Sequence, residues 1–289
     1  MKLHDRLIKT AEKDLYAART LFEKESYPQA IFFFQQSVEK ANKAFGLMSN
    51  KITENMLQNE IGHKPLKIHI TIVKEQKKNF ENYKKMFEQN LITETNALSK
   101  NDVNSLIKSS KKFIRITKKV DKEPQKHIRL STKELDEIIN FINDTSKEIS
   151  EIKVQNIKIN DEKAKGLKSQ FIKTFANIKK KYPLEANKIK QSLDQLRFQD
   201  LQDAATMFAE IMVILIPSYH SLLLLALIMH PHATTSRYPS EDGSPEDFYN
   251  IKLPLVKKLP ELLMIQEKAI DGIKSFQAYS KKKIKRGSK

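Results

Sequence analysis

The sequence predicts an all-α protein built as an antiparallel helical bundle. Three observations support this fold class. Apolar residues recur three or four positions apart along almost all of the 289 residues, which is the spacing of one helix face. No segment alternates apolar and polar residues between turn signals, as a half-buried strand would. The chain has only 6 Gly, far below the usual ~7 %, whereas barrels and sandwiches need many tight turns.

The first two helices are expected on either side of a short interruption at Ser26. The first carries one apolar stripe from residue 3 to about residue 22. Ser26 can cap the second helix, Pro28 is tolerated in a first turn, and Gln29 occupies the capping-box position. We expect the second helix to end near Gly46 or shortly after it.

Later helices have clear start and stop signals. Ser99 with Asp102 and Ser131 with Glu134 are spaced as capping boxes, and Pro124 interrupts the chain between them. Further helices are expected over residues 66–91, from about 100 to the break at Pro124, and over 131–152, 162–181, 184–211 and 261–279. Residues 51–64 look irregular or weakly helical, and a helix start is expected at 244–247.

The apolar run at 211–229 raises the question of a membrane span. It has 19 residues without a formal charge, close to the ~20 that a spanning helix needs. However, Pro217 and four polar residues, 218–221, lie at its centre, and no basic cluster flanks it. We therefore expect buried core, as two helices meeting near Pro217 or as one kinked helix, rather than attachment to a membrane.

Composition excludes several kinds of site. The chain has no Cys, which rules out disulfides, thiolate metal sites and a Cys nucleophile. No Gly-rich phosphate loop and no GxSxG string occur. The histidines have no defined metal spacing, so we expect neither a metal nor a cofactor. The first residues lack the apolar region of a signal peptide, which favours the cytoplasm.

The net charge of +17 is unevenly distributed. Residues 101–200 carry a net charge of +9, and the tail 281–289 is also basic. Residues 201–250 carry a net charge of −5, with Arg237 as their only basic residue apart from histidine. A polyanion would therefore dock on the Lys-rich middle of the chain.

Three segments resemble the HEPN domain family, a nucleotide-binding domain shared by higher eukaryotes and prokaryotes. Residues 8–50 are similar to its first two helices, including the core Gln35-Gln36-Ser37-Val38-Glu39-Lys40-Ala41-Asn42-Lys43-Ala44. Gly62-His63-Lys64-Pro65-Leu66 resembles its "His, any, Leu" helix start loosely. Ser236-Arg237-Tyr238-Pro239 resembles an Arg-Tyr-Pro string that precedes the last helix.

The resemblance implies a discontinuous domain, because a HEPN bundle has about half of this length. The resemblance assigns residues 1–75 and 205–280 to the HEPN-like bundle. Residues 76–204 would then be an inserted Lys-rich helical region, and 281–289 a basic tail.

The resemblance also bears on catalysis. Many HEPN proteins are metal-independent RNases marked by an Arg, four to six residues and then a His. None of the seven Arg here has a His four to seven residues downstream, so this motif is absent and we lean against an enzyme. A reversed arrangement, His232 before Arg237, would give an RNase with a non-standard site.

What remains is binding of a nucleotide or RNA, and the resemblance implies a toxin–antitoxin or phage-defence system as the setting. Lys40 and Lys43 share one helix face and, with Arg237, can hold a phosphate. Tyr238 can stack on a base, and His63 completes the expected site. The alternative is that these side chains only join helix to helix or chain to chain. We expect a homodimer, with an antitoxin-like protein as a further candidate partner; a non-catalytic partner-binding protein stays open as a rival function.

Overall fold

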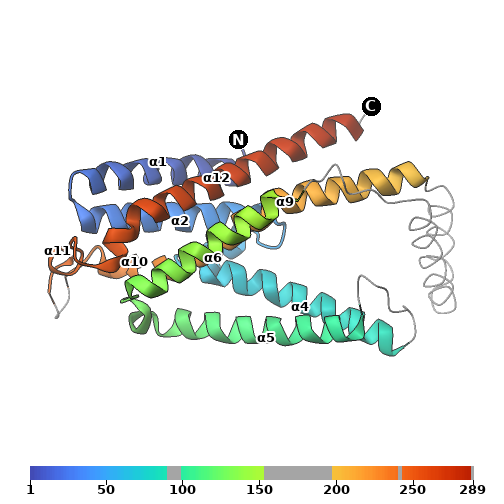
Figure 1. Cartoon of the computed structure of the whole chain (residues 1–289), viewed down its shortest axis with the longest axis horizontal. Coiled ribbons are helices and arrows are strands. Elements are labelled where there is room, and N and C mark those ends of the chain that lie inside the picture. The colour runs from blue at the N-terminus through green and yellow to red at the C-terminus, as the bar shows by residue number, and fades with distance from the viewer. Residues whose placement is uncertain (90–98, 153–196, 240–242, 288–289) are drawn as a thin grey trace. The chain divides into compact units, whose positions relative to one another are not determined.

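The computed structural model describes residues 1–89, 99–152, 197–239 and 243–287, and confirms the all-α fold class. Within these ranges no β-strand is present. In chain order the elements are α1 (Leu3–Glu23), α2 (Tyr27–Met48), α3 (Glu54–Met56), the π-helical turn η1 (Leu57–Ile61), α4 (Leu66–Glu88), α5 (Lys100–Lys122), the 3₁₀ turn η2 (Pro124–His127), α6 (Thr132–Ser150), α9 (Phe198–Met229), α10 (His232–Thr235), α11 (Pro245–Phe248) and α12 (Pro254–Gly287) (Figure 1).

The chain divides into two compact units. The described residues of the first are 1–73, 114–151, 213–239 and 243–287. Those of the second are 74–89, 99–113, 152 and 197–212. The stretch expected as an insertion thus contributes 114–151 to the first unit, whereas its residues 162–181 and 184–196 lie outside the described ranges. The domain boundaries drawn from the resemblance stay a prediction.

Helix α2 is the centre of the first unit. It packs along α1 as an antiparallel pair, and α12 lies against both helices (Figure 1). Helix α6 packs on α12 in turn. The largest side chains fully buried in this core are aliphatic or aromatic and come from helices far apart in sequence, among them Ile31, Phe34, Leu135, Leu222, Leu225 and Leu259.

The second unit contains a smaller apolar cluster. Phe87 of α4 packs with Val103 and Ile107 of α5, and Phe80 covers them. These contacts join α4 and α5 at the ends that lie in this unit.

The capping boxes expected at Ser131 and Ser99 are present, whereas the cap expected from Ser26 is not. The backbone N–H of Glu134 donates to Ser131 Oγ at 3.3 Å, and that of Ser131 donates to a Glu134 carboxylate oxygen at 2.8 Å. Ser99 and Asp102 bond in the same way. Ser26, in contrast, caps no backbone N–H; its hydroxyl donates to Gln29 Oε1 at 2.9 Å. Pro28 supplies no N–H, so α2 has one donor fewer to satisfy there.

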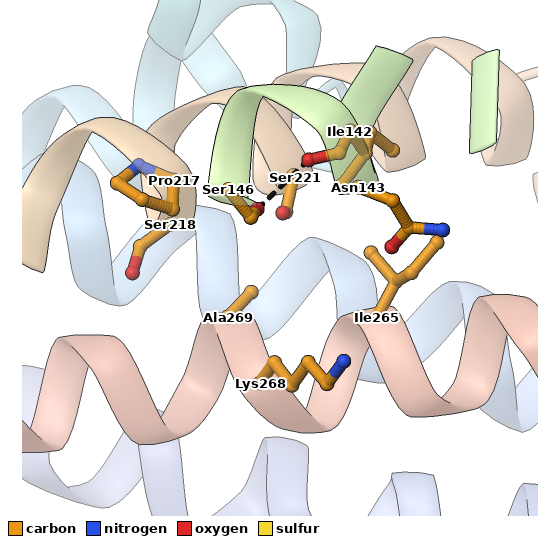
Figure 2. A pocket seen from close by; sticks show the side chains of 9 residues that line it. All are labelled: Ile142, Asn143, Ser146, Pro217, Ser218, Ser221, Ile265, Lys268 and Ala269. Carbon is orange, nitrogen blue, oxygen red and sulfur yellow. Dashed lines mark hydrogen bonds between the residues drawn. The ribbon is translucent and has the colours of Figure 1, made fainter. Parts of the chain in front are cut away.

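The apolar run lies in one helix, α9, with Pro217 inside it. Pro217 has no N–H to offer the carbonyl four residues earlier, whereas Ser218 Oγ donates to the Ile214 carbonyl at 3.1 Å. A cavity of about 60 Å³ lies beside this point. Figure 2 shows its lining, with small side chains of α6 and α9 such as Ser146 and Ser221 above Ala269 and Lys268 of α12.

One helical segment of the described residues, Gln202–Met229, is long and apolar enough to cross a membrane. Its mean hydropathy reaches 2.3, and a third of the apolar window is buried inside the protein. Being long and apolar enough is a matter of length and composition alone, and the core helix of a soluble protein meets the same two conditions.

The last helix begins earlier than the expected residue 261. It starts at Pro254 and continues through Pro260. Leu255, Val256 and Leu259 are all buried in the core. The free energy of burying three aliphatic side chains, about 1.5–3 kcal/mol each, exceeds what the missing N–H of Pro260 costs, which is about 3 kcal/mol.

Candidate functional site

The turn that carries Arg237 and Tyr238 is held in place by a buried histidine, His232. His232 Nδ1 lies 2.8 Å from the hydroxyl of Tyr249, and both side chains are about 1 % exposed. Ser236 Oγ donates to the His232 carbonyl at 2.8 Å. Burial lowers the pKa of His232 to about 3, so its imidazole is neutral at physiological pH. His232 therefore does not face solvent with Arg237, and the reversed His–Arg arrangement is wrong.

Arg237 is held by aromatic rings rather than by an acid. Its guanidinium carbon lies 5.0 Å from the ring centroid of Phe32 on α2 and 5.0 Å from that of Tyr238. Both distances are typical of cation–π contacts. Arg237 and Tyr238 are exposed, and no described residue forms an ion pair with Arg237. The positive charge is therefore available to a ligand.

A hollow of about 750 Å³ opens beside Tyr238. Arg237 itself is not among the lining residues, but the described lining includes another arginine, two threonines and two aromatic rings, namely Arg129, Thr234, Thr235, Tyr238 and Phe248. The Arg129 guanidinium lies 5.3 Å from the Phe248 ring centroid, and it too has no ion pair with a described residue. No carboxylate is among the described lining residues. Hydroxyls, rings and unneutralised guanidinium groups suit an anion that carries a planar ring.

A second cluster, the Glu39 cluster, lies on the carboxyl-terminal half of α2. Glu39 is only 3 % exposed, yet its Oε1 accepts from Lys43 Nζ at 2.7 Å and lies 3.1 Å from His63 Nδ1. Gln35 Nε2 donates to its other oxygen at 3.2 Å. Burial pushes the pKa of Glu39 upward, but the hydrogen bond and charge of Lys43, with Gln35 and His63, outweigh it and lower the pKa. Glu39 is thus ionised, and it orients the imidazole of His63, whose side chain is 83 % exposed.

Another imidazole–carboxylate pair lies in the same unit. His230 Nε2 lies 3.3 Å from Asp121 Oδ1, and Lys64 Nζ lies 3.8 Å from Asp121 Oδ2. Burial lowers the pKa of His230 more strongly than the neighbouring Asp121 raises it. Lys64 follows His63 directly, so the turn at 62–65 brings a basic side chain to each carboxylate. Nowhere in the described ranges do three His, Asp or Glu side chains converge as metal ligands.

Lys40 belongs to neither group, because its ammonium pairs with Asp14 of α1 and donates to Gln36 Oε1 at 3.1 Å. The five expected site residues therefore fall into three places. Arg237 and Tyr238 lie together on Phe32, Lys43 and His63 meet at Glu39, and Lys40 joins α2 to α1. Phe32 precedes Lys43 by eleven residues on α2, a rise of about 16 Å, so the first two places are distinct.

Sequence spacing did not indicate several of these partners. Arg129 and Phe248 border the hollow but belong to no quoted motif, and Asp121 and His230 are far apart in the chain. Glu39 stands inside the quoted core motif of α2, but it was not among the expected site residues.

The model of the HEPN domain family matches residues 4–120. This segment includes α2, α4 and nearly all of α1 and α5, and it confirms the resemblance drawn from residues 8–50. No curated protein and no solved structure matches the chain.

Proposed function

We propose that this chain binds a nucleotide or RNA in the hollow beside Tyr238, because its residues 4–120 match the model of the HEPN domain family. HEPN domains are generally related to nucleotides or RNA and often occur in toxin or defence systems. We place this protein in such a system, where the expected homodimer and antitoxin-like partner stay predictions.

One observation carries the proposal. Arg129 and Arg237 are the two guanidinium groups at this end of the unit, both exposed, both over aromatic rings and both without a carboxylate partner among the described residues. Arg19, in contrast, pairs with Glu267 at 2.9 Å. An unneutralised guanidinium binds phosphate through charge-assisted hydrogen bonds, and a phenol ring such as Tyr238 stacks on a base.

Titration with ATP and with a short single-stranded RNA, followed by fluorescence or calorimetry, tests this. Arg129→Ala and Arg237→Ala should each weaken binding about 10- to 100-fold, since a hydrogen bond to a charged group contributes about 1.5–3 kcal/mol. Tyr238→Ala should weaken it about 10-fold by loss of stacking. Arg19→Ala removes the same charge from a paired arginine and should leave affinity unchanged. Unchanged affinity in Arg129→Ala and Arg237→Ala would refute the proposal.

The Glu39 cluster favours one alternative, a metal-independent RNase with a non-standard site. An exposed imidazole held by a buried carboxylate is an arrangement that serves general acid–base catalysis. If this function holds, the protein should cleave single-stranded RNA in the presence of EDTA. His63→Ala should abolish the cleavage, whereas His4→Ala should retain it. RNA left intact by the wild-type protein would exclude the alternative under those conditions.

A further inference from the structure

Helix α5 carries positive charge along one exposed face. We call this set the basic row; its members are Lys108, Lys111, Lys112, Arg115, Lys119 and Lys122. Residues three or four apart share a helix face, so these side chains point the same way. The opposite face is buried through Val103, Ile107, Ser110, Thr117 and Val120. The helix is therefore fixed to the protein by one face and shows the basic row to solvent with the other.

Described carboxylates act on the basic row only at a distance: Glu81 interacts through its charge with Lys111, and Glu123 with Lys119 and Lys122. Helix α5 has no acidic residue between Asp102 and Asp121, and Asp121 pairs with His230 and Lys64 instead. No described residue forms an ion pair with a member of the row. On α4, in contrast, Lys77 pairs with Glu81, and Lys84 pairs with Glu88. Like charges at these spacings repel one another by a few tenths of a kcal/mol per pair, which a bound polyanion would reverse.

The geometry of the row suits a chain of phosphates. Its ends are 14 residues apart, which is about 21 Å along the axis, with about three cations for every two 5.4 Å turns. An anionic membrane surface is the other common partner of a basic helix, but it needs an apolar face free to insert, and the apolar face of α5 is buried.

We propose that the basic row of α5 binds the phosphate backbone of a nucleic acid. The row shares no residue with the hollow beside Tyr238, so it is a second binding surface and does not depend on the nucleotide site. Contacts of this kind confer affinity and orientation without reading bases.

The test uses the full-length chain and a mixed-sequence 20-nucleotide single-stranded RNA, with fluorescence anisotropy at 50 to 300 mM salt. The wild type should bind with a steep salt dependence. The triple variant Lys112→Ala, Arg115→Ala, Lys119→Ala should lower the slope of log K against log salt by about 2, since each phosphate contact on a single strand contributes about 0.7. Alanine has the highest helix propensity, so α5 should persist, which circular dichroism checks.

A matched control removes the same charge elsewhere. Lys9→Ala, Lys13→Ala, Lys133→Ala takes three exposed lysines from α1 and α6 and should keep the wild-type slope. ATP binding in the hollow should be unchanged in the α5 variant. If ATP fails to bind while RNA binding still depends on the basic row, the nucleotide proposal fails and the proposal for the basic row stands.

Three results would overturn the basic row as a nucleic-acid surface. The first is wild-type affinity and slope in the α5 variant. The second is an equal loss in the control, which would mean that only bulk charge matters. The third is that the protein binds phosphatidylserine vesicles through the basic row but does not bind RNA.

Discussion

His69 Nε2 lies 2.6 Å from Oδ1 of Asn42, inside the core of the first unit. The amide nitrogen of Asn42 donates to the carbonyls of Val38, at 2.8 Å, and Leu222, at 3.2 Å, which leaves its oxygen as the acceptor. The proton of a neutral His69 is therefore on Nε2. One hydrogen-bonded chain thus joins α4, α2 and α9.

Acid should begin to destabilise this protein at pH values well above those at which carboxylates titrate. Burial lowers the pKa of both His69 and His232 to about 3, against about 6.5 in the unfolded chain. Between these values the unfolded state binds more protons, so stability is complete above pH 6.5 and falls as the pH drops toward 3. At pH 5 the loss is about 2 kcal/mol for each imidazole. Urea denaturation at pH 7.5 and 5.0 measures it; an unchanged midpoint contradicts the burial of neutral imidazoles.

Asn42→Leu should destabilise the fold by about 1–3 kcal/mol. The substitution leaves the Nε2–H of His69 buried without an acceptor, and such a group costs its full desolvation. Denaturant midpoints measure the change. Asn104→Leu, on the exposed side of α5, serves as the comparison and should cost less than about 0.5 kcal/mol. Equal effects in the two variants would argue against the buried hydrogen bond.

Glu39→Gln should weaken the protein at neutral pH and lose that effect in acid. Although burial raises the pKa of Glu39, Lys43, Gln35 and His63 together lower it below 4.5. Its ionised form therefore contributes stability above pH 4.5, and this contribution is lost as the pH falls through the folded-state pKa. Midpoints of wild type and variant should differ at pH 7 and converge near pH 3. A constant difference across this range would show that ionisation of Glu39 contributes nothing.

Lys40→Ala should leave nucleotide binding unchanged although Lys40 was an expected site residue. Its ammonium is occupied by Asp14 and Gln36, and it lies at neither the hollow nor the Glu39 cluster. ATP affinity within twofold of the wild type is expected, and a loss as large as that of Arg237→Ala would return Lys40 to the site.

Gly272→Ala should cost about 1–3 kcal/mol, because a Cβ on Gly272 would lie 2.0 Å from Ser218 Oγ. That hydroxyl is bonded to the Ile214 carbonyl and cannot move aside without losing the bond. The double variant with Ser218→Ala should recover part of the loss, which thermal unfolding measures. No recovery would mean that the contact to Ser218 is not the cause.

Most of the secondary structure was predictable because its signals are local. The capping boxes at Ser131 and Ser99 lie within four residues of the helix that each begins. The start of α12 was not, because its first turn depends on burial of Leu255 and Val256 against distant helices. The local sequence signals at this point are Pro254 and Pro260, which predict a break rather than a helix.

The candidate site was predictable only in part, for the same reason. Lys40 and Lys43 share one face of α2, as spacing indicated, but spacing could not show that Lys40 pairs with Asp14 of α1. The approach of His63 to Glu39, and of Arg237 to Phe32, depends on tertiary packing that no spacing encodes. Arg129 had no signal at all, since it lies in a connection between η2 and α6.

The ion pairs between the first and last helices have a consequence for synthesis of the chain. Arg19 pairs with Glu267, and Glu12 pairs with Lys274. At about 5–20 residues per second, a ribosome needs about 10–50 s to make the chain between such partners. Throughout that interval the face of α1 and α2 that α12 will cover stays exposed to solvent. Contacts between residues far apart in the sequence also slow folding. The nascent protein should therefore engage chaperones until α12 emerges.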